Sequence, residues 1–247
     1  MTEPAFFEKA ALIKDNLQRV ETRLAQAAEK AGRSRQDVQL IAVTKLMPLE
    51  VIQAGIEAGL RVFGENYPEQ AAEKIAALET DSNLTWHMIG HIQSRKTNTV
   101  CGYFDWVHSV DRMKIAKYLD RYCQENDRVM PILIEVNLSG EESKFGWKAW
   151  DENRWSDLLP HFEKISQFPN LEIRGLMTMP PFFDDSELTR PYYQRLRRLQ
   201  GFLREQLSDI SWGELSIGTS FDYEVAVEEG ATMVRLGTTL FGPRPAR

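Results

Sequence analysis

Lys45 is the residue of this sequence best suited to covalent chemistry, because it directly follows the apolar run VQLIAVT. A lysine in a water-poor pocket has a lowered pKa, since burial disfavours the charged ammonium form. Its neutral amine can then attack an aldehyde and form a Schiff base. A lysine that closes a strand can also extend into solvent as a surface residue. Lys45 therefore indicates a reactive site only if it points into a cavity.

Two segments near the end of the chain have the composition of a phosphate-binding site. LSIGTS (215–220) and RLGTT (235–239) combine small residues, hydroxyl groups and backbone N–H groups. Such loops bind phosphate where a strand leads into a helix N-terminus. Glycine-containing loops alone are weak evidence, but a lysine that faces two of them is a more specific arrangement.

The scaffold that must position these residues follows from an alternation of short apolar runs with helical patterns. No linker is long enough to divide the chain, and strands joined by helical crossovers lie parallel. Eight such units in about 250 residues are typical of a closed (β/α)8 barrel. The expected strands are 38–45, 61–66, 84–90, 104–110, 130–138, 171–179, 214–219 and 231–237.

An open doubly wound sheet is the alternative α/β architecture. A dinucleotide-binding sheet would carry GxGxxG after its first strand, but this chain has TKLMP (44–48) there. We therefore expect an α/β fold in which residues 1–247 form a single (β/α)8 TIM-type barrel domain.

Residues 1–31 are expected to add one helix that packs on the barrel. Apolar residues recur there at steps of four and three, which places them on one helix face. A partner helix in a coiled coil is the alternative use of that face. The apolar stripe consists of Phe6, Ala10, Ile13, Leu17, Val20 and Leu24.

Active sites of such barrels lie at the C-terminal ends of the strands. Polar and small residues follow almost every predicted strand, and we expect them to gather at one end of the barrel. They are Lys45, Glu65, Asn66, His87, Gly90, His108, Ser109, Asp111, Asn137, Met177, Thr178, Ser216, Gly218, Thr219, Ser220, Arg235, Gly237 and Thr238.

Metal binding is not expected. His87 and His91 straddle a strand end and lack the HExxH pattern of helical zinc sites, so structural hydrogen bonding is the interpretation for them and for His108. Cys101 and Cys123 have neither metal-ligand spacing nor the density of a disulfide framework.

Composition excludes several classes of protein. The 247 residues carry a net charge of −6, whereas nonspecific nucleic-acid binding requires a basic surface. The basic stretch RLRRL (195–199) fits a solvated helix face better than a nucleic-acid site. Apolar runs are far shorter than the roughly 20 residues of a membrane span, and the N-terminus lacks a signal-peptide pattern. We expect a cytoplasmic protein.

Several characteristic blocks follow one another along the chain: IAVTKLMP, RVFGENY, TWHMIGHIQSRK, VHSVD, ILIEVNLSGEESKFG, GLMTMPP and LSIGTSFDYEVAVEEGATMVRLGTTLFG. In this order they resemble the pyridoxal phosphate homeostasis (YggS/PROSC) family, which is related to the N-terminal barrel of alanine racemases. The chain departs from that family at His91-Ile92-Gln93, where leucine-glutamine is common, and in the tryptophan-rich stretch WKAWDENRW (147–155).

The resemblance implies a pyridoxal 5′-phosphate (PLP) protein of fold type III, with the cofactor held on Lys45 as an internal aldimine. Asn66 would flank the ring and Arg235 would face the pyridine nitrogen. His87, Met177 and Lys144 are possible accessory residues. Ser216, Thr219, Ser220, Gly237 and Thr238 would surround the phosphate.

An arginine at the pyridine nitrogen argues against strong catalysis. Arginine stays protonated, so Arg235 can donate to that nitrogen but cannot give it a proton, and the ring becomes a weaker electron sink. The chain is also too short for the second domain that supplies the second base of racemases, which makes a monomer the expectation.

The resemblance therefore implies a role in vitamin B6 and amino-acid homeostasis, with apo PLP-dependent enzymes as possible acceptors of the cofactor and no efficient catalysis. The alternative is a PLP-dependent enzyme of racemase type that acts on a small amino acid. A regulatory binding protein, with a partner at the tryptophan-rich stretch or the N-terminal helix, is a third class. Lys144 could receive the aldehyde during transfer, or it could be an ordinary exposed loop lysine.

Overall fold

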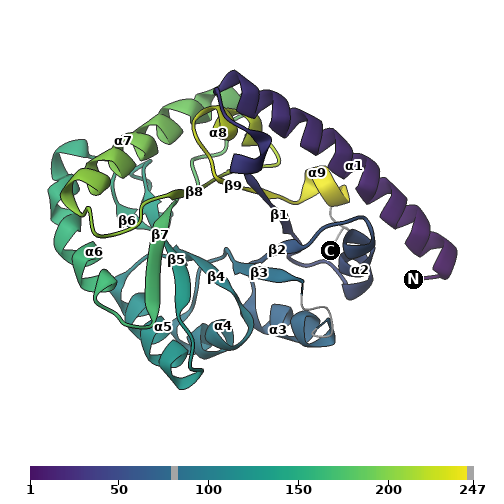
Figure 1. Cartoon of the computed structure of the whole chain (residues 1–247), viewed down its shortest axis with the longest axis horizontal. Helices are drawn as coiled ribbons and strands as arrows, with labels where there is room; N and C mark the ends of the chain where they lie inside the picture. The colour runs from purple at the N-terminus through teal and green to yellow at the C-terminus, as the bar shows by residue number, and fades with distance from the viewer. Residues whose placement is uncertain (79–82, 244–247) are drawn as a thin grey trace.

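The computed structural model describes residues 1–78 and 83–243, and its centre is a ring of parallel strands (Figure 1). Residues 244–247, which follow the final predicted strand, lie outside the described residues. The strands are β1 (Gln39–Val43), β2 (Val62–Glu65), β3 (Thr85–Met88), β4 (Trp106–Val110), β5 (Met130–Asn137), β6 (Trp147–Lys148), β7 (Leu171–Met177), β8 (Glu214–Thr219) and β9 (Met233–Leu236).

The sheet closes on itself and confirms the predicted barrel. Its order is β4-β3-β2-β1-β9-β8-β7-β5, and β4 also pairs with β5. All the pairs of this ring are parallel, with registers such as Ile41 opposite Arg235 and Gly64 opposite His87. Since each connection returns to the same end, the carboxyl ends of the strands converge there.

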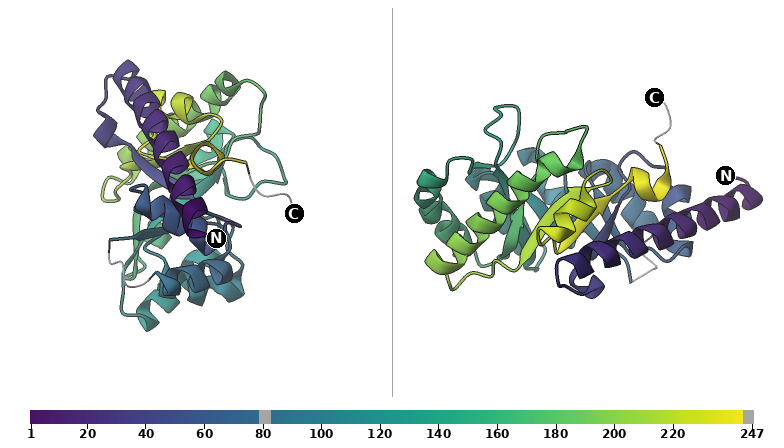
Figure 2. Two further views of the ribbon diagram at one scale, coloured as in Figure 1. Left: turned by 90° about the vertical axis from the view of Figure 1, so that its right-hand side faces the viewer. Right: turned by 90° about the horizontal axis from the view of Figure 1, so that it is seen from above.

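Helices surround the ring and cover the outer face of each strand (Figures 1 and 2). Short 3-10 turns, which the sequence did not indicate, precede several of these helices. The α-helices are α1 (Glu3–Lys30), α2 (Leu49–Glu57), α3 (Pro68–Ala77), α4 (Thr97–Tyr103), α5 (Met113–Glu125), α6 (Leu159–Ser166), α7 (Arg190–Gln206), α8 (Tyr223–Glu228) and α9 (Thr238–Phe241).

The N-terminal helix α1 lies along the outside of the barrel against α2, α8 and α9 (Figure 2). Lys9 Nζ donates to the carbonyl of Phe241 at 2.7 Å, and Asn16 Nδ2 donates to that of Leu240 at 2.9 Å. The predicted apolar stripe is confirmed as a packing face on the protein's own core. Its buried residues are Ala10, Ile13, Val20 and Leu24, with Phe6 and Leu17 partly buried.

The two-residue strand β6 was not predicted, and it explains part of the tryptophan-rich stretch. It pairs with the end of β5, and Trp147 Nε1 donates to the carbonyl of Val110 at 3.1 Å. Gly146, with φ of 110°, makes this close approach possible, because a Cβ there would lie 2.7 Å from Asn137 N. Trp155 is buried and donates to the carbonyl of Ala149 at 3.0 Å. Trp147 and Trp155 thus stabilise the segment after β5.

The basic stretch on α7 carries salt bridges within the chain. Arg198 and Arg195 both lie beside the carboxylate of Glu152, at 2.5 and 3.5 Å. Leu196 and Leu199 point into the core. The stretch therefore combines a packing face with a salt-bridged polar face, as expected for a helix on the barrel surface.

The two cysteines lie next to each other on neighbouring helices outside the ring of strands. Cys101 on α4 and Cys123 on α5 are both buried free thiols with sulfur atoms 3.1 Å apart.

The inside of the barrel is filled by a separate small cluster of Ile41, Leu133, Met177 and Met233. This layer forms the floor above which the strand-end residues gather.

Candidate functional site

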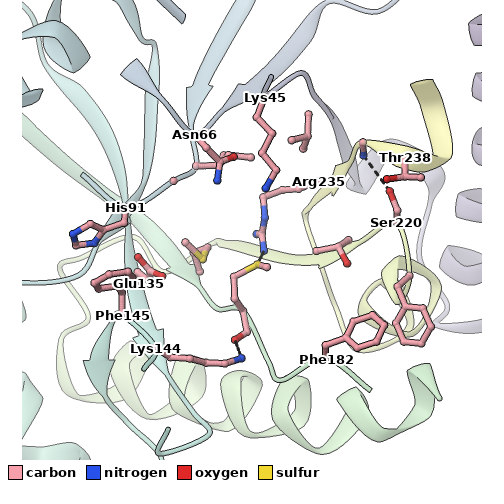
Figure 3. Close-up of a pocket in the computed structure, with 18 of the residues that line it drawn as sticks. Lys45, Asn66, His91, Glu135, Lys144, Phe145, Phe182, Ser220, Arg235 and Thr238 are labelled. Atoms are coloured by element: carbon pink, nitrogen blue, oxygen red, sulfur yellow. Dashed lines mark hydrogen bonds between the residues drawn. The ribbon is translucent and has the colours of Figure 1, made fainter. Parts of the chain in front are cut away.

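A pocket with a volume of about 690 Å³ opens at the carboxyl ends of the strands. Nine of the eleven cofactor-binding and accessory residues that the resemblance implies line it (Figure 3). Lys45 extends from β1 toward Arg235 on β9, with Ser220 and Thr238 on one side and His91, Glu135 and Phe145 on the other. The predicted residues that line it are Lys45, Asn66, Lys144, Met177, Thr219, Ser220, Arg235, Gly237 and Thr238.

The backbone that carries Lys45 is held by a buried polar network. Thr44 Oγ1 donates to Glu65 Oε1 at 2.8 Å, and Lys74 Nζ also lies 2.8 Å from this oxygen. Lys74 donates further to the carbonyl of Thr44 at 3.2 Å. Leu46 follows with φ of 62°, a left-handed conformation that is costly for leucine. This network and turn together direct Lys45 away from the strand and into the pocket.

Arg235 lies at the base of the pocket and is 5% exposed. Its Nη1 donates to Ser216 Oγ, and its Nη2 donates to the carbonyl of Thr178 at 3.2 Å and to Met179 Sδ at 2.8 Å. Burial lowers the pKa of Arg235, while the nearby Tyr193, Asp222 and Glu135 oppose that effect. These contacts hold the guanidinium in place. The N–H groups that they leave unused can donate to an acceptor on a ligand in the pocket.

Ser216 and His87 lie beneath the pocket instead of on its surface. His108 Nδ1 is 2.8 Å from Ser216 Oγ, and His108 Nε2 is 2.8 Å from His87 Nδ1. Burial lowers the pKa of His87 to about 3. Burial also lowers the pKa of His108 well below its usual value, so both rings are neutral at pH 7. Ser216, which was expected at the phosphate, lies in this chain of hydrogen bonds and supports Arg235.

The hydroxyl-rich loops form a cradle between β8, β9 and α9. Ser220 Oγ accepts hydrogen bonds from the backbone N–H of Gly237 at 3.1 Å and of Thr239 at 3.3 Å. Its own O–H is therefore left to donate toward the pocket, beside Thr238. Gly218, with φ of 87°, makes the turn possible, since a Cβ there would lie 2.6 Å from Ala226 Cβ. Two hydroxyls beside a helix start suit a phosphate group.

Asn66 lies on the other side of Lys45 at the end of β2. Its Oδ1 is buried and has no hydrogen-bond partner within the described chain. Gly90 packs directly against it, because a Cβ on Gly90 would lie 2.7 Å from Asn66 Cα. An amide with an unused polar atom at this position suits a ligand hydroxyl group.

Glu135 lines the pocket from β5, although it was not among the predicted residues. Glu135 is 8% exposed, and burial together with Asp111 raises its pKa to about 7. A signal was present: Glu135 interrupts the apolar run MPILIEVNL, two residues after Leu133 of the barrel interior. Side chains two apart on a strand point to the same side. Glu135 therefore had to face inward.

Lys144 lies at the mouth of the pocket, next to Phe145. Lys144 Nζ donates to the carbonyl of Met179 at 2.9 Å, and burial lowers its pKa. Asn137 holds this loop, since its Nδ2 donates to the carbonyl of Glu141 at 2.9 Å and to that of Lys144 at 3.3 Å. The loop and the hydrogen bond to Met179 thus hold Lys144 at the edge of the pocket.

Comparison with known proteins identifies the chain. The sequence pattern of the alanine racemase N-terminal domain matches residues 16–245. The pyridoxal phosphate homeostasis protein of Pseudomonas aeruginosa is 42% identical over 236 residues, which cover 94% of this chain and 96% of that protein. The chain belongs to the pyridoxal phosphate homeostasis family.

Solved structures agree with this assignment. PipY of Synechococcus elongatus PCC7942, solved with PLP bound, has a TM-score of 0.81 and 35% identity, covering 93% of this chain and 100% of that chain. The alanine racemase of Corynebacterium glutamicum shares the fold, with a TM-score of 0.67 and 16% identity. That match covers 95% of this chain and 62% of the racemase. This family member therefore has the racemase-type barrel, as predicted.

Within residues 1–78 and 83–243, no group of three or more His, Cys, Asp or Glu side chains is arranged to hold a metal ion. Over the same ranges, no helix combines the length and apolar character needed to cross a membrane.

Proposed function

We propose that this protein binds PLP through a covalent bond to Lys45 and serves in PLP homeostasis without efficient turnover of a substrate. The observation that carries the proposal is the convergence of Lys45, Arg235 and the Ser220–Thr238 cradle on one pocket. The PLP-bound structure of PipY, which covers 93% of this chain, supports it. When bound, PLP supplies an aldehyde carbon that forms a Schiff base with a primary amine.

Each part of the pocket has a role in this proposal. Ser220 and Thr238 donate hydroxyl hydrogen bonds to the phosphate, and Thr219 and Gly237 complete the wall around it. Asn66 binds the ring hydroxyl. Arg235 donates to the pyridine nitrogen, and the hydrogen bond to Ser216 keeps the guanidinium oriented for that contact.

Arg235 also favours binding over catalysis. A protonated guanidinium cannot transfer a proton to the ring nitrogen, which therefore stays neutral and withdraws electrons less strongly. Carbanion chemistry of the racemase type is correspondingly slow. We propose that the protein acts as a cytoplasmic monomer that holds PLP and delivers it to apo-enzymes. The wide pocket mouth, where Phe182 is 79% exposed, supports access for such a transfer.

The visible absorption spectrum of purified protein incubated with PLP tests the proposal. Wild type and the control Lys117→Ala, an exposed residue of α5, are expected to show a Schiff-base band that resists gel filtration. Lys45→Ala is expected to lose it. A band that survives in Lys45→Ala overturns the assignment of Lys45. Steady turnover of an amino acid by the loaded protein would instead establish the racemase-type alternative.

A further inference from the structure

Glu135 is a buried carboxylate that the described protein leaves partly without a partner. Its Oε2 atom is buried and receives no hydrogen bond, although the side chain lines the pocket. A buried polar atom without a partner is costly and indicates a missing ligand or water. Neighbouring Asp111 differs, because Arg112 Nη1 lies 2.6 Å from its Oδ1 and His91 Nδ1 lies 2.9 Å from its Oδ2.

The wall that carries Glu135 presents charges of both signs. Lys144 Nζ lies at the pocket mouth, where it donates to the carbonyl of Met179. Glu135 lies deeper, beside His91 and Phe145, whose rings stack at 3.6 Å between centroids (Figure 3). A deep carboxylate and a shallow ammonium complement a molecule with an ammonium group and a carboxylate group.

The proposed cofactor does not account for this wall. Its phosphate is assigned to the cradle at Ser220 and Thr238, on the far side of Arg235 from Glu135 (Figure 3). The pocket volume of about 690 Å³ lies within the range that holds drug-sized ligands. A single-ring phosphate ester is smaller than such ligands, so a second small molecule has room.

We propose that the wall formed by Glu135, Lys144 and Phe145 is a binding site for a free α-amino acid. The ammonium group binds to Glu135 and the carboxylate binds to Lys144. This site goes beyond PLP binding and rests on the proposed function only in that it shares the same pocket.

The remaining lining favours an amino acid with an apolar side chain. Phe145, Met179 and Phe182 line the same pocket and are 53%, 46% and 79% exposed. Apolar surface of this kind gains free energy when a hydrocarbon side chain covers it. Leucine is therefore the probe of choice.

Calorimetric titration tests the site on protein loaded with PLP and then reduced with borohydride. Reduction converts the Schiff base to a stable secondary amine, so an added amine cannot exchange with Lys45. The probes are leucine, 3-methylbutylamine, which lacks the carboxylate, and 4-methylpentanoate, which lacks the amine. The variants are Glu135→Gln and Lys144→Gln, with Glu142→Gln as control, since Glu142 is an exposed neighbour in the same loop and does not line the pocket.

Leucine is expected to bind wild type and Glu142→Gln alike. Glu135→Gln is expected to lower the affinity for leucine and for 3-methylbutylamine by about tenfold or more, because a charged hydrogen bond is lost. Lys144→Gln is expected to lower the affinity for leucine and to leave the affinity for 3-methylbutylamine unchanged. Absence of leucine binding to loaded wild type, or equal affinity in Glu135→Gln, overturns the proposal.

Two further measurements distinguish a loss of leucine binding from misfolding of a variant and from incomplete loading with PLP. Circular dichroism of each variant verifies that it is folded, and absorbance of the reduced cofactor verifies loading. If wild type does not load with PLP, the proposed function fails, and the titration on cofactor-free protein still tests the amino-acid site. Glu135→Gln could lower the affinity for leucine only in the cofactor-free protein. In that case Glu135 binds the cofactor in the loaded protein, and the proposal is wrong.

Discussion

Ser216 Oγ accepts a hydrogen bond from Arg235 Nη1 and lies 2.8 Å from His108 Nδ1, so one hydroxyl links the base of the pocket to a buried histidine pair. Arg235 and His108 have no direct hydrogen bond, and Ser216 is completely buried between them. The orientation of the pocket's deepest cation therefore depends on a residue that does not line the pocket.

Ser216→Ala tests this dependence. The substitution leaves a buried N–H of Arg235 and a buried nitrogen of His108 without a partner, which is expected to cost about 1–3 kcal/mol of unfolding free energy. PLP affinity is expected to fall as well, because the guanidinium loses its orientation. Chemical denaturation and equilibrium PLP titration measure the two effects. Ser211→Ala, at an exposed position, is the control. Unchanged PLP affinity would show that Ser216 only stabilises the fold.

Ser220→Ala tests the phosphate cradle. The variant loses a hydroxyl donor and leaves the N–H groups of Gly237 and Thr239 without their acceptor. PLP affinity is expected to fall by about tenfold or more, as for other hydrogen bonds to charged groups. Pyridoxal, which lacks the phosphate, serves as the matched ligand and is expected to bind wild type and variant equally. A parallel loss for both ligands would place Ser220 away from the phosphate.

Glu135 is expected to make stability depend on pH. Burial raises its pKa from 4.5 to about 7, with Asp111 adding to the shift and Arg235 and Arg112 opposing it. The native state then binds more protons than the unfolded state between these values, so stability falls as pH rises from about 4.5 to 7. Glu135→Gln removes this loss. The melting temperature of the variant minus that of wild type is expected to increase from pH 4.5 to pH 8. A difference that stays constant with pH would contradict the raised pKa of Glu135.

The histidine pair is expected to act in the opposite direction. Burial lowers the pKa of His87 from 6.5 to about 3. The unfolded state binds the extra proton first, so the stability from neutral His87 is present above pH 6.5 and is lost as pH falls toward 3. His87→Asn is expected to be less stable than wild type at pH 7, with the difference shrinking at pH 4.5. Urea unfolding at both pH values measures it, and a constant difference would refute this account.

Lys144→Ala tests whether the loop lysine takes part in cofactor transfer. Lys144 lines the pocket and has a pKa lowered by burial, so a larger fraction of its amine is neutral and able to accept an aldehyde. The rate of PLP release to an apo-enzyme is expected to fall in the variant, while the equilibrium spectrum of the loaded protein stays the same. Lys148→Ala, at an exposed position on β6, is the control. Equal release rates in wild type and Lys144→Ala would exclude the transfer role.

The barrel and the N-terminal helix were predictable because their signals are local. Apolar runs at strand length and the stripe from Phe6 to Leu24 depend only on residues close in sequence. The strand β6 was not predictable in this way. It has two residues, and it forms because Gly146 lets the chain approach β5 so closely that a side chain there would collide with Asn137.

The sequence by itself determined the barrel and the end at which its polar residues gather, because parallel strands joined by helices carry their C-terminal residues to one face. It also singled out Lys45, Arg235 and the hydroxyl-rich loops. The tertiary structure decided which of these residues face the pocket and which lie below it. Ser216 and His87 lie below, while Glu135, which the strand alternation already turns inward, has one buried oxygen without a hydrogen-bond partner. Burial and hydrogen bonding arise from contacts between strands far apart in sequence, and no local pattern of residues encodes them.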